Sequence, residues 1–254
     1  MSLRLKTLRI VPSMAELRGI PDGKALINTI NAHSFNTAQH DTAFAEALSC
    51  GDFLIPDGAS IVKACRWLKA KSQPKERIAG WDLFAYEMSS LNEKMKEGWN
   101  EGMEKGKVMF LGSSEKVLSL IRERAAKDYP NLEVVTFSPP YKPEFSEEDN
   151  RTMIKAINDA DPDLLWIGMT APKQEKWAYS HWKELDIHCH CGTIGAVFDF
   201  YAGTVKRAPE WWQRNSLEWL YRLLMEPRRM WRRYIIGNAK FLYNICKEGL
   251  GICD

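Results

Sequence analysis

Asp57 is the residue of this sequence best placed for acid–base chemistry. It follows a short apolar run, Asp52–Pro56, and precedes a glycine at the turn into another predicted helix. A carboxylate in such partly apolar surroundings is typical of a general base, although Asp57 could also do no more than cap its helix. Thr29 and Asn31 end the neighbouring predicted strand, where they could orient a substrate hydroxyl or serve as turn and cap residues.

Turns containing glycine could bind a phosphate or a ribose. Gly112-Ser113-Ser114 presents backbone amides and hydroxyls at the start of a predicted helix, which suits an anion. The turns at Gly168 and Gly192 likewise follow predicted strands. The sequence has no G-x-G-x-x-G, no Walker lysine loop and no G-x-S-x-G elbow. Dinucleotide-dependent redox enzymes, P-loop NTPases and elbow-type serine hydrolases therefore lose their best support.

Two short motifs could suggest a metal, and neither is expected to bind one. Asp161-Pro162-Asp163 precedes its strand, which puts it at the amino edge of the predicted sheet, opposite the other candidate residues. Cys189-His190-Cys191 lies in an apolar run whose alternate side chains point to opposite faces, so the three cannot converge. We expect no metal and no cofactor. The charge of a leaving diphosphate would then have to be met by arginines and backbone amides.

The C-terminal part of the chain is both basic and aromatic. Its cations are Lys206, Arg207, Arg214, Arg222, Arg228, Arg229, Arg232 and Arg233, and its tryptophans are Trp211, Trp212, Trp219 and Trp231. Helical spacing predicts one helix that ends at Pro227 and a second from about Arg228 to Lys247. These helices could simply dock on the rest of the protein, or they could lie at a membrane surface. Exposed apolar residues in this segment could also mediate self-association.

Composition agrees with a globular protein whose charge is local. The chain has 254 residues, 45% of them hydrophobic, and a formal net charge of +2. The N-terminus has no signal-peptide pattern, and no apolar run reaches the roughly 20 residues that a membrane-spanning helix needs. We expect the six cysteines to be reduced thiols in a cytoplasmic protein.

The order of apolar runs predicts an α/β fold. The expected strands are Ala25–Asn31, Asp52–Pro56, Val108–Leu111, Leu132–Phe137, Asp163–Ile167 and Ile187–Cys191, with helices between them. Ser34 or Asn36 could cap the helix that follows the first strand, through Thr42–Leu48. Ser146-x-x-Asp149 predicts a capping box for the helix through Ile157. Short apolar strands that alternate with helices indicate a mostly parallel sheet covered on both faces. In such folds ligands bind beyond the carboxyl ends of the strands, where the turns named above lie. We expect a core of residues 1–205 and a helical appendage of residues 206–254.

Several motifs resemble the WecG/TagA/CpsF glycosyltransferase family, over roughly residues 25–240. In the first half they are Pro56-Asp57-Gly58 and Arg77-x-x-Gly80-x-Asp82. Further on they are Gly168-x-x-x-Pro172-Lys173-Gln174-Glu175, Gly192-x-x-Gly195-x-x-Phe198-Asp199 and Lys206-Arg207-Ala208-Pro209. The tail adds Leu217-Glu218-Trp219-Leu220-Tyr221-Arg222-Leu223, Glu226-Pro227-Arg228-Arg229 and Arg232-Arg233-Tyr234.

The resemblance implies a Rossmann-like, metal-independent, inverting glycosyltransferase of cell-envelope polysaccharide synthesis. Such an enzyme moves a hexose, of the N-acetylmannosamine type or another, from a UDP-sugar to a polyprenyl-diphosphate-linked saccharide. It works on the inner face of the cell membrane as a peripheral protein. Its C-terminal appendage approaches the membrane and completes the active site.

The resemblance also implies roles for individual residues. Asp57 matches the proposed catalytic base, Arg77 an important arginine near the site, and Gln174 a pocket-lining glutamine. Thr29 and Asn31 match residues that line the substrate pocket, whereas Arg222, Arg229 and Arg232 lie in the appendage thought to contact the diphosphate. From the strand-edge rule alone we expect the uridine over the turns at Gly112, Ser138–Tyr141 and Gly192–Gly195, and further substrate contacts at Ser113 and Gly168.

Two other classes of function stay open at this point. The arginines and tryptophans of the tail could belong to a non-enzymatic nucleic-acid-binding module, but the near-neutral overall charge counts against a nucleic-acid partner. A nucleotide-dependent redox enzyme is suggested by analogy of fold alone.

Overall fold

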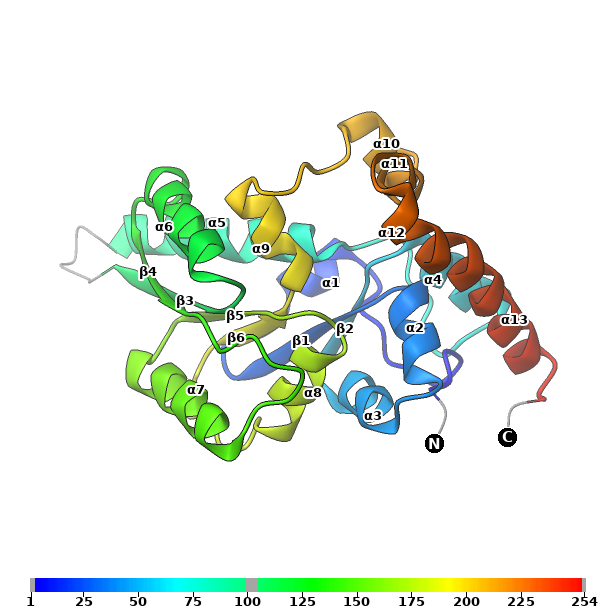
Figure 1. Ribbon diagram of the computed structural model, residues 1–254, viewed down its shortest axis with the longest axis horizontal. Helices are drawn as coiled ribbons and strands as arrows, with labels where there is room; N and C mark the ends of the chain where they lie inside the picture. The colour runs from blue at the N-terminus through cyan, green and yellow to red at the C-terminus, as the bar shows by residue number, and fades with distance from the viewer. Residues whose placement is uncertain (1–2, 99–104, 253–254) are drawn as a thin grey trace. The chain divides into compact units, whose positions relative to one another are not determined.

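The computed structural model describes residues 3–98 and 105–252, and it shows an α/β protein with a six-stranded sheet (Figure 1). The strand order is β2-β1-β6-β5-β3-β4, and all strands run parallel. The strands are β1 (Ala25–Ile30), β2 (Phe53–Pro56), β3 (Gly106–Gly112), β4 (Leu132–Phe137), β5 (Leu164–Gly168) and β6 (His190–Thr193). The predicted fold class is confirmed.

The last strand begins later than the apolar pattern predicted. Ile187 and Cys189 are buried in the core, yet β6 starts at His190. Its ladder with β5 pairs Leu164 with His190. Burial in this run therefore starts at Ile187, before the first residue of the strand, so the apolar composition of the run indicates burial and not the strand boundary.

The chain folds into two compact units, each made of segments that are not contiguous in sequence. Unit 1 comprises the described residues of Met1–Leu17, Thr29–Ala79 and Lys206–Asp254, and unit 2 comprises Arg18–Asn28 and the described residues of Gly80–Val205. The division of the chain into residues 1–205 and 206–254 stays a prediction. In unit 1, the N-terminal segment, the first two strand ends and the tail share one core, which includes Phe35, Phe44 and Phe241.

Unit 2 is a sheet covered by helices on both faces. In Figure 1, α5 (Gly80–Gly98), α6 (Glu115–Asp128) and α9 (Gly195–Ala202) lie on one side of β3, β4 and β5. On the other side lie α7 (Glu147–Ala160) and α8 (Lys173–Ser180). Aromatic rings fill the first face: Phe84 lies 5.5 Å from Trp166 and 4.8 Å from Tyr201, measured between ring centroids.

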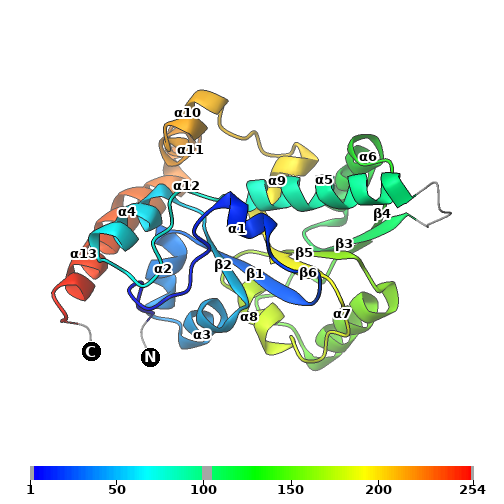
Figure 2. The ribbon, with the colours of Figure 1, turned by 180° about the vertical axis from the view of Figure 1, so that it is seen from behind.

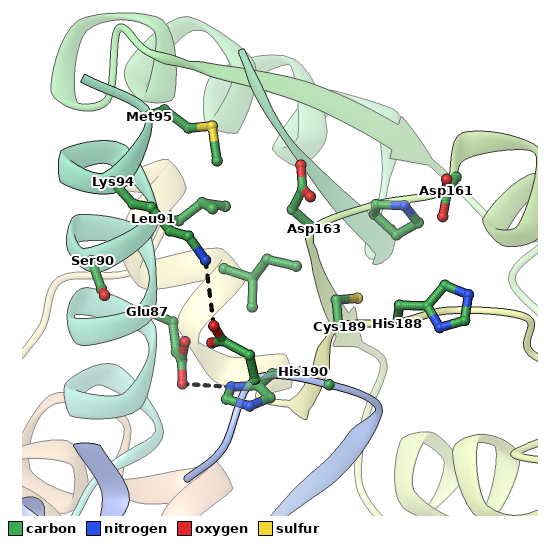
Figure 3. Close-up of a pocket in the computed structure, with 14 residues that line it drawn as sticks. Glu87, Ser90, Leu91, Lys94, Met95, Asp161, Asp163, His188, Cys189 and His190 are labelled. Atoms are coloured by element: carbon green, nitrogen blue, oxygen red, sulfur yellow. Dashed lines mark hydrogen bonds and ion pairs between the residues drawn. The ribbon is translucent and has the colours of Figure 1, made fainter. Parts of the chain in front are cut away.

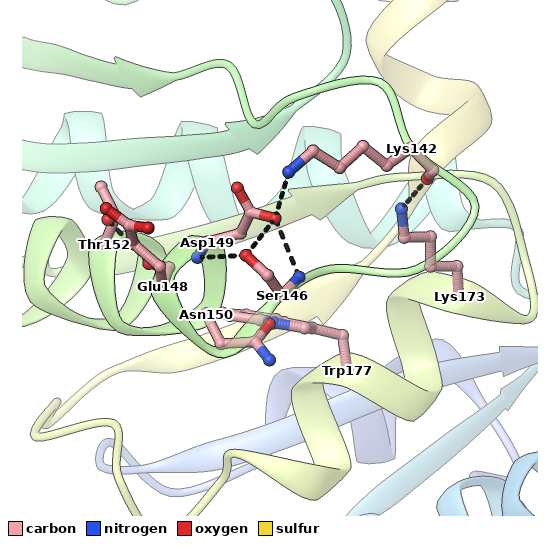
Figure 4. A network of polar contacts seen from close by, with 8 residues as sticks. All are labelled: Lys142, Ser146, Glu148, Asp149, Asn150, Thr152, Lys173 and Trp177. Carbon is pink, nitrogen blue, oxygen red and sulfur yellow. Dashed lines mark hydrogen bonds and ion pairs between the residues drawn. The ribbon is translucent and has the colours of Figure 1, made fainter.

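Capping chemistry decides where several helices begin. Ser146 and Asp149 form the predicted capping box at the start of α7, with Ser146 N donating to Asp149 Oδ2 at 2.8 Å. Asp149 Oδ2 also accepts from Lys142 Nζ at 2.7 Å, and Lys173 Nζ donates to the Lys142 carbonyl (Figure 4). The hydrogen bonds from Lys142 and then Ser146 lower the pKa of Asp149 to about 2. This network holds the β4–α7 connection in place.

The region after β1 differs from the prediction. We expected Ser34 or Asn36 to cap a single helix through residues 42–48. The structure has two helices there, α2 (Ala32–Ala38) and α3 (Thr42–Cys50). Asn31 caps α2 through a capping box with Ser34, whereas Asp41 Oδ1 accepts from Phe44 N at 2.9 Å and caps α3. The predicted cap was wrong because Asn31 already starts a helix directly at the strand end.

The tail consists of short helices followed by a long helical run. The short helices are α10 (Glu210–Arg214) and α11 (Glu218–Met225), of which the pattern predicted only the second. The run comprises α12 (Pro227–Trp231), a π-helical turn η2 (Arg232–Ile236) and α13 (Gly237–Gly249). It matches the predicted helix from about Arg228 to Lys247. Among the described residues, no helix is long and apolar enough to span a bilayer.

The helix α13 is docked firmly within unit 1. It lies beside α2 in both views (Figures 1 and 2), where the rings of Phe35 and Phe241 meet edge to face at 5.5 Å. Asn36 Nδ2 donates to the Gly237 carbonyl at 2.7 Å. Near the end of the helix the buried Glu248 carboxylate accepts from Lys6 N at 2.6 Å and from Leu5 N at 3.1 Å. Of the two predicted arrangements of the tail helices, docking on the rest of the protein is therefore correct for α13.

Candidate active site

In unit 1 the carboxyl ends of β1 and β2 bring Asn31, Asp57 and Arg77 together. A Cβ added to Gly58 would lie 3.5 Å from Asn31 Cβ, so the two turns are in contact. Ile78 N donates to the Pro56 carbonyl at 3.1 Å, which places the segment of Arg77 along the end of β2. We call Asn31, Asp57 and Arg77 the strand-tip cluster.

Asp57 is partly buried at the start of the turn into α4 (Ala59–Trp67). Its backbone N–H donates to the Ile55 carbonyl at 3.0 Å. The N-cap position of α4 belongs to Gly58, which has no side chain with which to cap. Asp57 therefore lies one residue before the N-cap position of α4. The role of its carboxylate as a base stays a prediction.

Asn31 does act as a cap. Its Oδ1 accepts from His33 N at 3.0 Å and from Ser34 N at 3.1 Å, which fixes the side chain at the end of β1. Thr29, two residues earlier, is partly buried. A substrate contact from Asn31 would fall to its amide nitrogen, because the oxygen already serves two backbone donors.

The tail reaches the strand-tip cluster through an ion pair. Arg77 Nη1 lies 2.6 Å from Glu218 Oε2, and Arg207 Nε lies 3.6 Å from Glu218 Oε1. The side chains are 19–21% exposed, so the charges are only partly hydrated. Two guanidinium groups therefore share one carboxylate on α11, within unit 1.

The predicted arginines of the tail occupy different environments. Arg222 is partly buried on α11, whereas Arg232 is exposed with its guanidinium carbon 5.3 Å from the centre of the Trp231 ring. Arg229 belongs to α12, and its side chain lies outside the described part of the structure. Burial and then the positive charge of Arg233 lower the pKa of His33. The tail thus brings positive charge close to the first turn of α2.

Large apolar side chains are exposed along the same tail. In order they are Trp211, Trp219, Leu224, Met225, Trp231, Ile235, Ile236, Leu242, Tyr243, Leu250 and Ile252. Several lie close to cations in the sequence: Trp231 precedes Arg232, and Ile235 lies two positions after Arg233. A basic and apolar surface of this kind is typical of proteins that contact an anionic lipid interface.

In unit 2 the glycines at the strand ends serve close packing. Gly112 has a positive φ of 122°, and a Cβ there would lie 2.4 Å from the Gly168 carbonyl oxygen. A Cβ on Gly192 would come within 2.3 Å of the Trp166 ring. Ser113 has a φ of 63°, and its carbonyl accepts from Ser138 Oγ at 2.9 Å. Backbone therefore approaches closely at Gly112 and Gly192, and the atoms that it approaches belong to the protein.

Gln174 is buried and joins two of these turns. Its Oε1 accepts from Met169 N and from Gly195 N, both at 3.1 Å. Gly195 must be a glycine for this packing, because a Cβ there would lie 2.4 Å from the Met169 carbonyl oxygen. The Gly195 turn was predicted to contact the substrate, but in this structure the Gly195 N–H donates to Gln174. Gln174 ties the turn after β5 to the turn after β6.

Tyr141 is fully exposed on the connection between β4 and α7. The prolines at 139, 140 and 143 stiffen this connection, and the network around Asp149 anchors it. An aromatic ring presented in this way could stack on a flat ligand.

Sequence reasoning missed Glu175 and Asn28 as polar groups of this region. Glu175 is 1% exposed, and burial raises the pKa of its carboxyl to about 7. Asn28 is fully buried on β1, where its Oδ1 accepts from Thr193 Oγ1 at 2.7 Å. In the sequence, Asn28 could have been found as a polar residue inside an apolar strand. Nothing in the sequence marks Glu175 as buried, because an acidic residue in the first turn of a helix is ordinary.

A pocket of about 320 Å³ opens at the opposite, amino edge of the sheet in unit 2 (Figure 3). Asp161, Asp163 and His190 are among its lining residues, so the Asp-x-Asp motif does lie where its position before β5 indicated. Both ring nitrogens of His190 are engaged, Nδ1 with Glu87 Oε1 and Nε2 with the Pro21 carbonyl, each at 3.0 Å. None of the predicted site residues lines this pocket.

Comparison with protein families gives one match over nearly the whole chain. The model described as the glycosyl transferase WecG/TagA/CpsF family matches residues 5–252. The match includes the strand-tip cluster, the turns of unit 2 and the tail.

Individual relatives share about three residues in ten with this chain. An N-acetylglucosaminyldiphosphoundecaprenol N-acetyl-beta-D-mannosaminyltransferase of Bacillus subtilis (strain 168) is 30% identical over 224 residues, covering 88% of this chain and 80% of the relative. The protein of the same name from Bacillus spizizenii is 31% identical, covering 88% and 79%. That from Staphylococcus aureus (strain MW2) is 29% identical over 228 residues, covering 87% and 79%.

Proposed function

Because this chain belongs to the WecG/TagA/CpsF glycosyltransferase family, we propose that it transfers a hexose from a UDP-sugar to a polyprenyl-diphosphate-linked saccharide. The names of its relatives favour an N-acetylmannosamine-type donor sugar and an N-acetylglucosaminyl-diphosphate lipid acceptor. The proposed setting is cell-envelope polysaccharide synthesis. The enzyme would act at the inner face of the cell membrane.

The observation that carries the proposal is the link between the strand-tip cluster and the basic tail in unit 1. Asp57 supplies a carboxylate, the segment of Arg77 lies along the end of β2, and Glu218 ties Arg77 to α11. A base and a group of cations are the two things that transfer from a nucleotide diphosphate sugar requires. We assign the acceptor hydroxyl to Asp57, Thr29 and Asn31.

The proposed reaction is a single displacement. The Asp57 carboxylate takes the proton of the acceptor hydroxyl as that oxygen forms a bond to the anomeric carbon of the donor. The bond from that carbon to the diphosphate oxygen breaks, and the electron pair leaves with UDP. Attack from the face opposite the leaving group inverts the configuration of the anomeric carbon.

Arginines and backbone amides would meet the charge of the departing diphosphate without a divalent cation. Arg222, Arg229 and Arg232 are the tail residues proposed for this role, and guanidinium groups match phosphate oxygens in geometry. In unit 2, the turns that contain Gly112, Ser113, Gly168, Gly192 and Gly195 are proposed to hold the nucleotide. Tyr141 is proposed as a stacking surface for the uracil.

Membrane contact is proposed for the exposed apolar and basic residues of the tail. Trp231, Ile235 and Leu242 are 41–62% exposed on the run that begins at Pro227. Interfacial binding of such a surface would bring the enzyme to an acceptor that is held in the membrane by its lipid. The alternative is that the same residues mediate self-association. Sedimentation with and without vesicles distinguishes self-association from membrane binding.

One experiment tests the proposed function. The full chain is mixed with a panel of UDP-sugars and an N-acetylglucosaminyl-diphosphate polyprenol in vesicles, and released UDP is measured. We expect release that depends on the acceptor, persists in EDTA, and yields a product whose anomeric configuration is opposite to that of the donor. Absence of acceptor-dependent release with every donor would refute the proposal.

A further inference from the structure

Glu175 is a buried acid that the proposed reaction does not use. It is the third residue of α8 and 1% exposed. Its Oε1 accepts from Gln174 Nε2 at 2.9 Å, whereas its Oε2 has no hydrogen-bond partner within residues 3–98 and 105–252. A buried carboxyl oxygen without a partner lowers stability, and an apolar side chain of the same size would not carry that cost.

The side-chain amide of the neighbouring Gln174 can satisfy its hydrogen bonds in only one orientation. The Gln174 side-chain oxygen accepts two backbone N–H groups, one from each of the turns after β5 and β6. If the amide turned over, its NH₂ group would face two other donors and both turns would lose their acceptor. An acceptor beside Nε2 is what selects the correct orientation, and Glu175 Oε1 is that acceptor.

We propose that Glu175 is a positioning residue whose buried carboxyl locks the Gln174 amide with its oxygen on the Met169 and Gly195 N–H groups. Glu175 acts through Gln174 and touches no substrate. The consequence for turnover rests on the proposed function, since these two turns are assigned there to the donor nucleotide. The consequence for the two turns does not depend on it.

The first test needs no substrate. Hydrogen exchange is measured at the amides of Met169 and Gly195 in the wild type, Glu175→Leu and Glu175→Gln. Leucine has a similar size and no acceptor, so we expect exchange at both amides to be about tenfold faster, as for the loss of a hydrogen bond. Glutamine retains a carbonyl oxygen that can accept from Gln174, and we expect it to restore most of the protection.

The second test asks whether the effect passes through Gln174. Glu175→Leu should raise the KM for the donor about tenfold while the thermal midpoint stays equal or rises, because the variant removes a buried unpaired oxygen. The double variant Gln174→Leu/Glu175→Leu should be no worse than Gln174→Leu alone. If Glu175 were merely structural, Glu175→Leu would lower the thermal midpoint. The effects of Gln174→Leu and Glu175→Leu on KM would then multiply in the double variant.

Each outcome decides the inference. Unchanged exchange at Met169 and Gly195 in Glu175→Leu would overturn it, and so would independent effects in the double variant. If the wild type releases no UDP from any donor while the exchange result is as expected, the proposed function fails and the positioning role stands. If the wild type is fully active while exchange is unchanged, the positioning role fails and the proposed function stands.

Discussion

Arg77 and Glu218 lie 141 positions apart in the sequence, yet Arg77 Nη1 and Glu218 Oε2 are 2.6 Å apart. The pair joins the segment beside β2 to the first turn of α11. The tail of the chain and the proposed catalytic base belong to the same compact unit.

Removal of the Glu218 charge should loosen this part of unit 1. Glu218→Gln keeps the shape but leaves the partly buried Arg77 and Arg207 without this carboxylate, and we expect a loss of about 2 kcal/mol in the free energy of unfolding. Urea denaturation measures it. The control is Glu210→Gln, which breaks the pair with Arg214 in which both side chains are 80% exposed. That change should cost less than about 0.5 kcal/mol; equal losses in both variants would contradict the argument.

Asp57→Asn should abolish transfer without unfolding the protein. The amide has the shape of the carboxylate but cannot take a proton, so we expect kcat to fall by roughly 100- to 10,000-fold. The thermal midpoint should stay within a few degrees of the wild type. Asp52→Asn is the matched control, at an exposed position just before the same strand. Wild-type kcat in Asp57→Asn would rule out Asp57 as the base.

Two neighbouring residues of α13 should separate docking from membrane contact. Phe241 is 3% exposed and packs on Phe35, so Phe241→Ala should cost about 3 to 4 kcal/mol in denaturation. Leu242 is 62% exposed. Leu242→Ala should change stability by less than about 0.5 kcal/mol and should weaken binding to anionic vesicles about tenfold. Unchanged vesicle binding would remove Leu242 from the proposed membrane surface.

Gly195→Ala should disturb the turns of unit 2. Its Cβ would lie 2.4 Å from the Met169 carbonyl oxygen and 2.6 Å from Gln174 Oε1, so we expect a loss of about 2 kcal/mol and a higher KM for the donor. Gly237→Ala is the control, since its Cβ would meet only the Arg232 carbonyl at 3.8 Å in a helix. That change should stabilise the protein by about 0.5 to 1 kcal/mol. A stabilising Gly195→Ala would show that the close approach is absent in solution.

The buried acid predicts a pH dependence with a definite sign. The pKa of the Glu175 carboxyl rises from 4.5 to about 7 because of burial, so the folded state keeps a proton that the unfolded state loses. Stability from this group therefore falls as the pH rises from about 4.5 to 7, and the penalty is complete above that range. Glu175→Gln does not titrate there. Its stability relative to the wild type should increase by about 2 to 3 kcal/mol between pH 5 and pH 8 in denaturation curves; a difference independent of pH would contradict this.

The sequence by itself determined the class of fold and the family. Short apolar strands that alternate with helices have one common solution, a parallel sheet with helices on both faces, and local signals such as the Ser146–Asp149 capping box act over a few residues. The alternation of strands and helices and the local capping signals did not determine the order of the strands in the sheet. They also did not determine that β6 starts at His190, because burial and strand pairing are different constraints on the same apolar run.

Only the tertiary structure decided which residues meet. Arg77 pairs with Glu218, and Phe241 packs on Phe35. Both contacts join segments that are far apart in the chain, and no local sequence pattern encodes such a contact. The fully buried Glu175 looks in the sequence like any acid in the first turn of a helix. Its burial and its raised pKa come from the packing of α8 against the sheet, because desolvation depends on everything that surrounds a group in space.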